Sequence, residues 1–313
     1  MRLYLCSALS VAALAACAAA VPRKAQPHAN ARKLAPEGHP NGALPGRITQ
    51  QQEAAGAQAP DDQPVSMRSP AKPECPEGML LLRRPVGRYC IDRYEASLVE
   101  RRPPARPWPG NQNIDGREAE FLAVSRAGVK PQGYISGAQA EVVCHNAGKR
   151  LCELDEWVRA CRGPKVTRYP YGDQRKPNIC NDRFKRLDRH PVVRLFQETA
   201  RAGTDPRLMW YPSFMNQPRL HEMPDSVSET GAFPGCTNEF GAYDMVGNLH
   251  EWVAGASGIF VGGFFMDTFQ NGEGCEYRTL AHPFDYHDYS TGFRCCSEPA
   301  EAGRGLASTS AAD

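Results

Sequence analysis

Apolar residues with the spacing of strands or helices begin near residue 79, after a long stretch that lacks any such pattern. Two short apolar runs, Met79–Leu82 and Tyr89–Tyr94, flank a turn at Pro85–Gly87 and predict an antiparallel pair of strands. Two later runs, Gly258–Phe265 and Tyr289–Cys296, are also typical of strands. The folded part is therefore expected to contain a mixed, mostly antiparallel sheet.

Helical periodicity is found in segments between these runs. Ser136 is a suitable N-cap for a helix over 137–147. A second helix is expected over Glu153–Cys161, with Trp157 on its buried face, and Val192–Ala200 predicts a further short helix. Most of the remaining sequence is rich in turn-forming residues. The pattern indicates an α+β domain with two main helices and little regular secondary structure.

The N-terminus has the features of an export signal. An apolar stretch follows Arg2 and ends in Leu14-Ala15-Ala16-Cys17, which resembles a bacterial lipobox. The stretch is too short to span a bilayer. We expect residues 1–16 to be a lipoprotein signal peptide and Cys17 to carry the lipid. The alternative is an ordinary signal peptide that is cleaved nearby, after Ala16 or Ala20.

The rest of the chain divides into a tether, a domain and a tail. Residues 17–74 are rich in Ala, Pro, Gln, Gly and Arg and cannot bury enough apolar surface to fold, so we expect a disordered tether. The folded domain is predicted over 75–298, followed by a disordered tail over 299–313. Because Ala18 rather than Asp follows the lipobox cysteine, we expect the periplasmic face of the outer membrane, with the lipid as the only membrane anchor.

Composition narrows the class of protein further. The chain has 313 residues, of which 41% are hydrophobic, and its formal net charge is +2. Its mean hydropathy is −0.52. Near neutrality, without a basic stripe, argues against a nucleic-acid partner.

The cysteine count agrees with export. Of the twelve cysteines, Cys6 lies in the predicted signal and Cys17 is assigned to the lipid, which leaves an even number for disulfides in an oxidising compartment. Cys75 and Cys90 form the most local candidate pair. No C-x-x-C pair occurs, so zinc ribbons and thioredoxin-like motifs are not supported.

Candidate chemistry concentrates in Gly241–Trp252, a run of turn-forming, acidic and aromatic residues. Asp244 and Glu251 can supply carboxylate oxygens, and a turn at Gly247-Asn248 can direct backbone carbonyl groups to the same place. A small cation is one candidate occupant. In the alternative interpretation, the apolar residues of the motif are core and the two carboxylates cap nearby backbone N–H groups.

Several short motifs occur in a characteristic order. They are Gly148-Lys149-Arg150-Leu151 with Glu156-Trp157, Tyr169-Pro170-Tyr171-Gly172, Asn178-Ile179, Tyr243–Trp252, Gly262-Gly263-Phe264 and Gly292-Phe293-Arg294. The ordered set resembles the formylglycine-generating enzyme (sulfatase-modifying factor) family over about residues 75–297. The resemblance implies the compact, disulfide-rich fold of that family, which is related to C-type lectin domains, and calcium ions that stabilise its loops.

The resemblance also implies metal ligands. One calcium site would comprise Asp244, the carbonyl groups of Gly247 and Leu249, and Glu251. A second would use Asn178 and the carbonyl group of Ile179, but its other ligands do not align with this sequence. Calcium is therefore the expected cofactor.

Activity in the family is the copper-dependent oxidation of a sulfatase cysteine to formylglycine, with copper held by two cysteines spaced C-x-x-x-x-C. Alignment through Tyr277-Arg278 places Gly274 and Thr279 where those cysteines would be, and Cys275 is one residue out of register. Copper is therefore not expected. We expect Cys275 to form a disulfide with Cys295 or Cys296.

Other candidate residues are less constrained. The catalytic candidates are Cys275, Thr279 and Arg294, and the alternative role of Arg294 is a buried ion pair with Glu251 or Asp244. His282, Asp285, His287 and Asp288, with His250 nearby in the fold, contain donors that suit a transition metal, although loop residues of these types commonly bond to backbone instead.

Two functions follow, and the sequence leaves open whether the protein is an enzyme. The first is a calcium-stabilised binding or structural module that presents a cleft to a peptide, protein or glycan in the periplasm. The second is an oxidoreductase, either of the formylglycine-generating type or of a sister type with its metal elsewhere. The missing cysteine pair favours the first.

Overall fold

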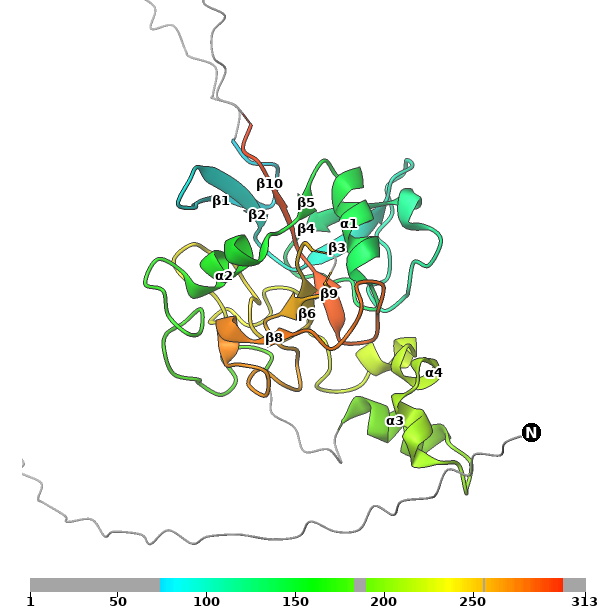
Figure 1. Cartoon of the computed structure of the whole chain (residues 1–313). Coiled ribbons are helices and arrows are strands. Elements are labelled where there is room, and N and C mark those ends of the chain that lie inside the picture. The colour runs from blue at the N-terminus through cyan, green and yellow to red at the C-terminus, as the bar shows by residue number, and fades with distance from the viewer. Residues whose placement is uncertain (1–73, 183–189, 256, 301–313) are drawn as a thin grey trace, which may run out of the picture. The chain divides into compact units, whose positions relative to one another are not determined.

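The computed structural model describes residues 74–182, 190–255 and 257–300 (Figure 1). The predicted signal peptide, nearly all of the predicted tether and most of the predicted tail lie outside these residues, and so does Cys17. Within the described part, no helix combines the length and the apolar character that crossing a bilayer requires.

Three small sheets form the framework. Strands β1 (Met79–Arg83) and β2 (Arg88–Asp92) make the predicted antiparallel hairpin. Their sheet continues through β10 (Cys295–Ser297) to β5 (Arg150–Leu151), in the order β1-β2-β10-β5. The last described strand, β10, therefore lies inside the sheet that the first two strands begin.

The other two sheets are built from strands that sequence patterns only partly revealed. Strands β3 (Ala96–Glu100) and β4 (Phe121–Ser125) form an antiparallel pair. The third sheet has the order β8-β7-β6-β9, comprising β8 (Arg278–Thr279), β7 (Phe260–Val261), β6 (His250–Trp252) and β9 (Thr291–Phe293). Among the strand pairs of the described residues, only β6–β9 is parallel, which confirms the mostly antiparallel character.

The two main helices lie where they were expected. Helix α1 (Gly137–Asn146) begins after Ser136, whose side chain accepts a hydrogen bond from the backbone N–H of Gln139. The Gln139 side chain accepts one from the Ser136 N–H in return, which completes a capping box. Helix α2 (Leu154–Arg162) buries Trp157 completely.

The predicted third helix is also present and opens a compact helical segment. It comprises α3 (Pro191–Thr199), a 3₁₀ turn over Pro206–Trp210, α4 (Pro212–Met215) and a 3₁₀ turn over Pro218–His221. Further 3₁₀ turns occur at Glu118–Glu120 and Gly274–Glu276. In Figure 1, α3 and α4 lie together below the sheets.

Two expected strands are shorter or divided. Gly258–Phe265 contributes only β7, because the backbone turns sharply at its glycines. Tyr289–Cys296 becomes two strands of different sheets, β9 and β10, separated by Arg294. Arg294 turns inward at this junction and is completely buried. Buried Arg294 therefore separates the predicted strand Tyr289–Cys296 into two strands that belong to different sheets.

The described residues contain five disulfides, four of which join segments far apart in the sequence. The pairs are Cys75–Cys90, Cys144–Cys295, Cys152–Cys296, Cys161–Cys275 and Cys180–Cys236. The local pair of Cys75 with Cys90 is confirmed. The expected pairing of Cys275 with Cys295 or Cys296 is wrong. Adjacent residues of a strand point to opposite faces, so Cys295 and Cys296 reach the two segments that lie on either side of β10.

The core consists of three apolar clusters. The first surrounds Trp157 between α2 and the first sheet, and the second surrounds Trp252 under α1. The third connects α3 to the C-terminal part of the domain through Val192, Phe265 and Tyr289. The helical segment is thus packed on the domain rather than separate from it.

Candidate functional site

The motif Gly241–Trp252 surrounds a buried ion pair. The Arg294 guanidinium donates from Nε and Nη2 to the two carboxylate oxygens of Glu251, at 2.5 Å and 2.6 Å. The Trp157 indole N–H donates to the same carboxylate at 2.6 Å. Arg294 also donates to the backbone carbonyl oxygens of Asp92 and Tyr243. Arg294 therefore joins β2, β6 and the turn before β6, and Glu251 adds α2 through Trp157.

Electrostatics explain why this arginine remains charged. Burial by itself opposes the charged form of Arg294, but the Glu251 carboxylate and the nearby Glu95 and Asp244 raise its pKa above the ordinary value. A fixed cation with five donors in a planar fork suits this position better than lysine would. The structure thus confirms the alternative in which Arg294 forms a buried pair with Glu251.

Two more carboxyl groups lie around this pair. Burial, followed by the neighbouring charges of Asp244 and Glu251, raises the pKa of Glu95 well above its usual range. Its carboxyl oxygens accept hydrogen bonds from the Asn248 amide and the Leu249 N–H. Burial also raises the pKa of Asp244 to about 6, although the Gly231 N–H bonded to its carboxyl group opposes this shift. Burial and the neighbouring carboxylates therefore favour the neutral form of Glu95.

This arrangement does not fit the implied calcium site at Asp244, Gly247, Leu249 and Glu251. Both Glu251 oxygens already bind Arg294, and a calcium ion on the same oxygens would lie beside the guanidinium in a buried setting, where like charges repel strongly. Within residues 74–300, apart from the undescribed gaps, no group of three or more His, Cys, Asp or Glu side chains could hold a metal ion. Calcium binding stays a prediction from the resemblance.

The second implied calcium site contains only its two local members. Asn178 is exposed and has a left-handed backbone, and Ile179 is followed by the Cys180–Cys236 disulfide. The nearest acidic residue along the chain, Asp182, bonds Arg175 at 2.8 Å. These described residues do not form a ligand shell.

The region expected to hold the copper cysteines contains an oxidised sulfur. Cys275 is fully buried and bonded to Cys161, so it has no thiol. Thr279 lies on β8, and its hydroxyl oxygen accepts a hydrogen bond from the Ala281 N–H. No described hydrogen bond or ion pair joins Arg294 to either residue. The three catalytic candidates are therefore not brought together as a reacting site.

The structure places the candidate transition-metal ligands in separate environments. His282, Asp285 and His287 line one pocket of about 490 Å³. Asp288 turns inward, where its carboxylate accepts hydrogen bonds from the Tyr286 and Ser290 hydroxyls. The donors that a transition metal would need do not converge.

His250 lies apart from this pocket in an aromatic cage. Its ring centroid is 4.5 Å from that of Phe260, 4.8 Å from that of Phe264 and 5.4 Å from that of Tyr277. Burial lowers the pKa of His250 to about 3, so its ring is neutral. Its Nδ1 atom has no hydrogen-bond partner among the described residues.

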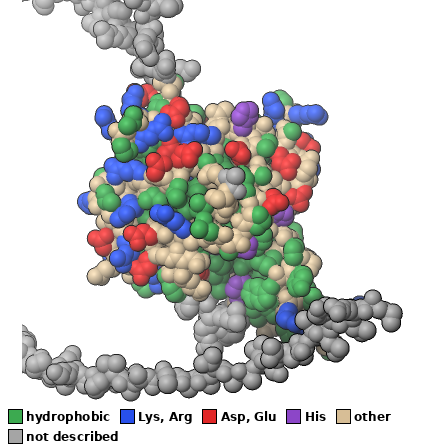
Figure 2. All heavy atoms as spheres, viewed as in Figure 1, with side chains coloured by type: hydrophobic (Ala, Val, Ile, Leu, Met, Phe, Trp, Pro, Cys, Tyr) green, Lys and Arg blue, Asp and Glu red, His purple; other side chains and the backbone are tan. Residues whose placement is uncertain are grey.

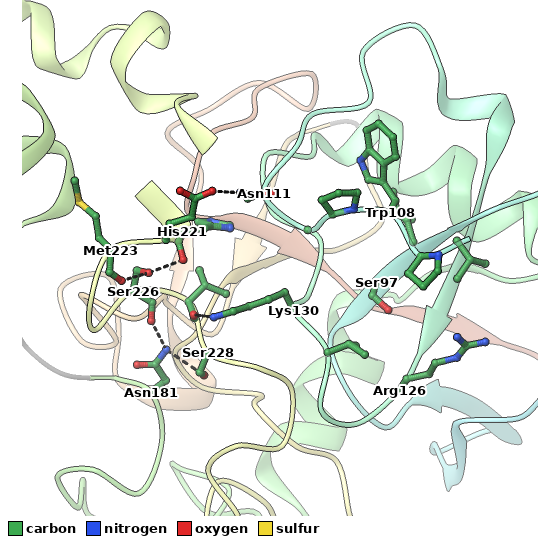
Figure 3. Close-up of a pocket in the computed structure, with 18 of the residues that line it drawn as sticks. Ser97, Trp108, Asn111, Arg126, Lys130, Asn181, His221, Met223, Ser226 and Ser228 are labelled. Atoms are coloured by element: carbon green, nitrogen blue, oxygen red, sulfur yellow. Dashed lines mark hydrogen bonds between the residues drawn. The ribbon is translucent and has the colours of Figure 1, made fainter. Parts of the chain in front are cut away.

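A larger cavity, which we call the Lys130 pocket, has a volume of about 770 Å³. Its walls are β3 and the segments 107–111, 126–130 and 221–228 (Figure 3). Apolar lining residues include Trp108 with its flanking prolines, Met223 and Val227, and the charged lining residues include Arg126 and Glu222. Apolar walls with charges of both signs are typical of a binding site.

Hydrogen bonds hold the Lys130 pocket open in a defined shape. The Lys130 ammonium group donates to the Val227 carbonyl oxygen, and the Asn111 amide donates to the Glu222 carboxylate at 3.0 Å. Desolvation lowers the pKa of Lys130. Burial lowers the pKa of His221 to about 4, and its Nε2 atom bonds the Tyr289 carbonyl oxygen. The walls are therefore fixed before any ligand binds.

Sequence reasoning missed several of these residues. The sequence patterns assigned no role to the segment around Trp108, which forms a pocket wall. They also missed Glu95 and the buried pair of Asp92 with Lys149, whose charged atoms are 2.8 Å apart. The available signal was the position of Asp92 and Glu95 between two apolar runs, 89–91 and 98–99, where unpaired acids are rarely buried.

Comparison with known proteins agrees with this architecture. A family model for the sulfatase-modifying factor enzyme 1-like domain matches residues 110–298. The fold and the site thus define a disulfide-rich α+β domain of the formylglycine-generating-enzyme type. The chain belongs to the sulfatase-modifying factor enzyme 1-like family.

Two curated relatives carry the same description, "inactive C-alpha-formylglycine-generating enzyme 2". The protein from Bos taurus is 30% identical over 125 residues, which cover 40% of this chain and 32% of the relative. The protein from Mus musculus is 25% identical over 178 residues, which cover 53% of this chain and 49% of the relative. The chain therefore matches less than half the length of either relative.

Solved structures with detectable similarity include PvdO from Pseudomonas aeruginosa and CarF. PvdO is 15% identical, with a TM-score of 0.38, over 72% of this chain and 99% of that chain. CarF is 16% identical, with a TM-score of 0.35, over 71% and 93%.

Proposed function

We propose that this protein is a non-catalytic member of its family that binds a peptide segment of a partner protein in the Lys130 pocket. The observation that carries the proposal is the Cys161–Cys275 disulfide. A copper dithiolate needs two thiolates, and each of the ten cysteines between Cys75 and Cys296 is bonded in a disulfide. The descriptions of the curated relatives as inactive support the same conclusion.

The choice of a peptide ligand has two supports. The name of the curated relatives, "inactive C-alpha-formylglycine-generating enzyme 2", refers to formylglycine, and because formylglycine is a modified amino-acid residue we take a polypeptide as the ligand class. The pocket also suits a peptide, because Trp108, Met223 and Val227 can surround an apolar side chain. Arg126 and Lys130 supply donors for carbonyl or carboxylate groups.

A peptide selection tests the pocket assignment. Full-length protein is used to enrich a phage-displayed random peptide library, and affinities are measured for the enriched peptides. The charge-reversal variants Arg126→Glu and Lys130→Glu are expected to weaken binding by about tenfold or more, about 1.4 kcal/mol. Arg83→Glu, which makes the same change on β1 outside the pocket, is the matched control and should leave affinity unchanged. Equal binding by all variants would place the peptide site elsewhere.

A second experiment tests the non-catalytic assignment. Full-length protein is incubated with copper, oxygen and a cysteine-containing sulfatase peptide, and the peptide is analysed by mass spectrometry. We expect no conversion of the cysteine to formylglycine. Copper-dependent conversion would establish the oxidoreductase alternative.

We also propose export as a lipoprotein of the outer membrane, which would place any partner in the periplasm. Five disulfides persist most readily in an oxidising compartment, and the lipobox ends at Cys17. In a bacterial host, labelled palmitate should be incorporated into the wild-type protein and not into Cys17→Ser. Labelling of the variant, or a soluble wild-type protein, would contradict this assignment.

A further inference from the structure

We propose a second ligand site, distinct from the Lys130 pocket, that binds a neutral saccharide. It is the cavity of about 490 Å³ between the helical segment and the loop before β9, which we call the Trp210 pocket. Trp210, Pro212, Met215 and Asn216 form one wall, and His282, Asp285, Tyr286 and His287 form the other. This site goes beyond the proposed peptide binding and does not depend on it.

The two walls are joined before any ligand arrives. The Asn216 side-chain oxygen lies 2.9 Å from His287 Nδ1, and the Tyr289 N–H donates to the Met215 carbonyl oxygen at 3.1 Å. Asn113 approaches the same imidazole, with its amide nitrogen 3.1 Å from Nδ1. The cavity is therefore preorganised, which reduces the entropy lost when a ligand binds.

Aromatic surface is exposed at this site. Trp210 keeps 44% of its surface accessible, while His190 packs edge-on against its ring at 5.1 Å between centroids. Opposite it, the Tyr286 ring stacks on His282 at 3.9 Å. Figure 2 shows hydrophobic side chains gathered over the region of α3 and α4. An indole with one accessible face can pack against the C–H groups of a pyranose ring.

Polar groups suited to hydroxyls accompany these rings. Asp285 is exposed, and its carboxylate forms no hydrogen bond or ion pair with the other described residues. A carboxylate accepts from two hydroxyl groups at once, which matches adjacent hydroxyls of a sugar ring. Burial lowers the pKa of His282 and so favours the neutral ring, which offers one donor and one acceptor.

Charge and size select among ligand classes. The wall residues include no lysine or arginine and one aspartate, so an anionic ligand would meet net repulsion. The volume lies within the range typical of small-ligand pockets. An uncharged saccharide satisfies the aromatic face, the carboxylate and the absence of cationic side chains together.

Ligand-observed NMR with full-length protein and neutral oligosaccharides, maltotriose and N,N′,N″-triacetylchitotriose, tests the proposal. We expect at least one probe to bind with a Kd of millimolar order. Asp285→Asn and Trp210→Ala should each weaken binding about tenfold or more, with folding checked by circular dichroism. Leu208→Ala, an exposed apolar neighbour outside the pocket, should change affinity less than about twofold.

Asp285→Asn keeps the test informative if Trp210→Ala perturbs the helical segment, because Asp285 is exposed and has no described partner. The proposal is overturned if neither saccharide binds at about 20 mM, far above a millimolar Kd. It is also overturned if binding persists unchanged in Asp285→Asn, or if enriched peptides rather than saccharides lose affinity in the Trp210-pocket variants.

Discussion

Arg294 and Glu251 form a two-point ion pair in which neither side chain has more than 1% of its surface exposed. Arg294 lies between β9 and β10, at the point where the chain passes from one sheet to another, and Glu251 lies on β6. The pair also binds the indole of Trp157 and the backbone at Tyr243. The motif Gly241–Trp252, where candidate chemistry was expected, therefore contributes to a buried ion pair that stabilises the fold.

Glu251→Gln is expected to destabilise the protein by about 3 to 5 kcal/mol, because Arg294 would remain buried without a compensating charge. Urea unfolding of the oxidised protein measures the free energy of unfolding. Glu298→Gln is the control. Glu298 pairs with Arg150 with 59% of its side chain exposed, and its loss should cost less than about 1 kcal/mol. Similar free energies of unfolding for the two variants would show that the buried pair contributes no more to stability than the exposed pair.

Calcium should have little effect if Glu251 is occupied as described. After treatment with EDTA, adding about 1 mM calcium should leave the thermal midpoint unchanged, since a ligand stabilises only a state that it binds. Differential scanning fluorimetry provides the measurement, with magnesium as a control for ionic strength. A rise specific to calcium that disappears in Asp244→Ala would restore the site implied by the resemblance and require Glu251 to leave Arg294.

His221 predicts a specific dependence of stability on pH. Burial lowers its folded pKa from 6.5 to about 4, so the unfolded chain binds a proton between these values and the folded protein does not. The resulting stability is complete above about pH 6.5 and is lost as the pH falls toward 4. His221→Gln, which can still donate to the Tyr289 carbonyl oxygen, removes this titration.

The comparison is made between wild type and His221→Gln at pH 7 and pH 5. The difference in their free energies of unfolding should shift by about 2 kcal/mol in favour of the variant at the lower pH. Using a difference cancels the opposing titrations of buried carboxyl groups such as Asp244. A constant difference across this range would mean that His221 titrates normally in the folded protein.

Removing the Cys161–Cys275 disulfide should cost more than removing the local one. Its cysteines are 114 residues apart, against 15 for Cys75–Cys90. In the chain-entropy model, replacing both cysteines by serine should cost about 5 kcal/mol in the first case and about 3 kcal/mol in the second. Urea unfolding compares the two double variants. The reverse order would show that strain or residual structure, rather than loop length, governs these crosslinks.

The sequence was informative wherever the determining interactions are local. The Ser136 cap, the burial of Trp157 and the hairpin of β1 with β2 each depend on residues close together in the chain, and each is confirmed. The Cys75–Cys90 pair belongs to the same class because its loop is short. The order of the motifs was likewise sufficient to identify the family.

Long-range relationships were beyond the sequence pattern. Cys275 was paired with the wrong partner because the β10 cysteines diverge to opposite faces of a strand, and their partners lie more than 140 residues away. The Lys130 pocket brings segment 126–130 to segment 221–228, and the Trp210 pocket brings residues 210–216 to residues 282–287. Periodicity carries no information about which distant loops meet.

The sequence by itself determined the family, the fold class and the absence of the aligned cysteine pair. Only the tertiary structure decided what the acids and sulfurs of these motifs do. Glu251 binds Arg294 rather than standing free for a cation, and Cys275 is locked to Cys161. The physical reason is that a buried charge or thiol takes its role from the partner that folding places beside it, and that partner comes from elsewhere in the chain.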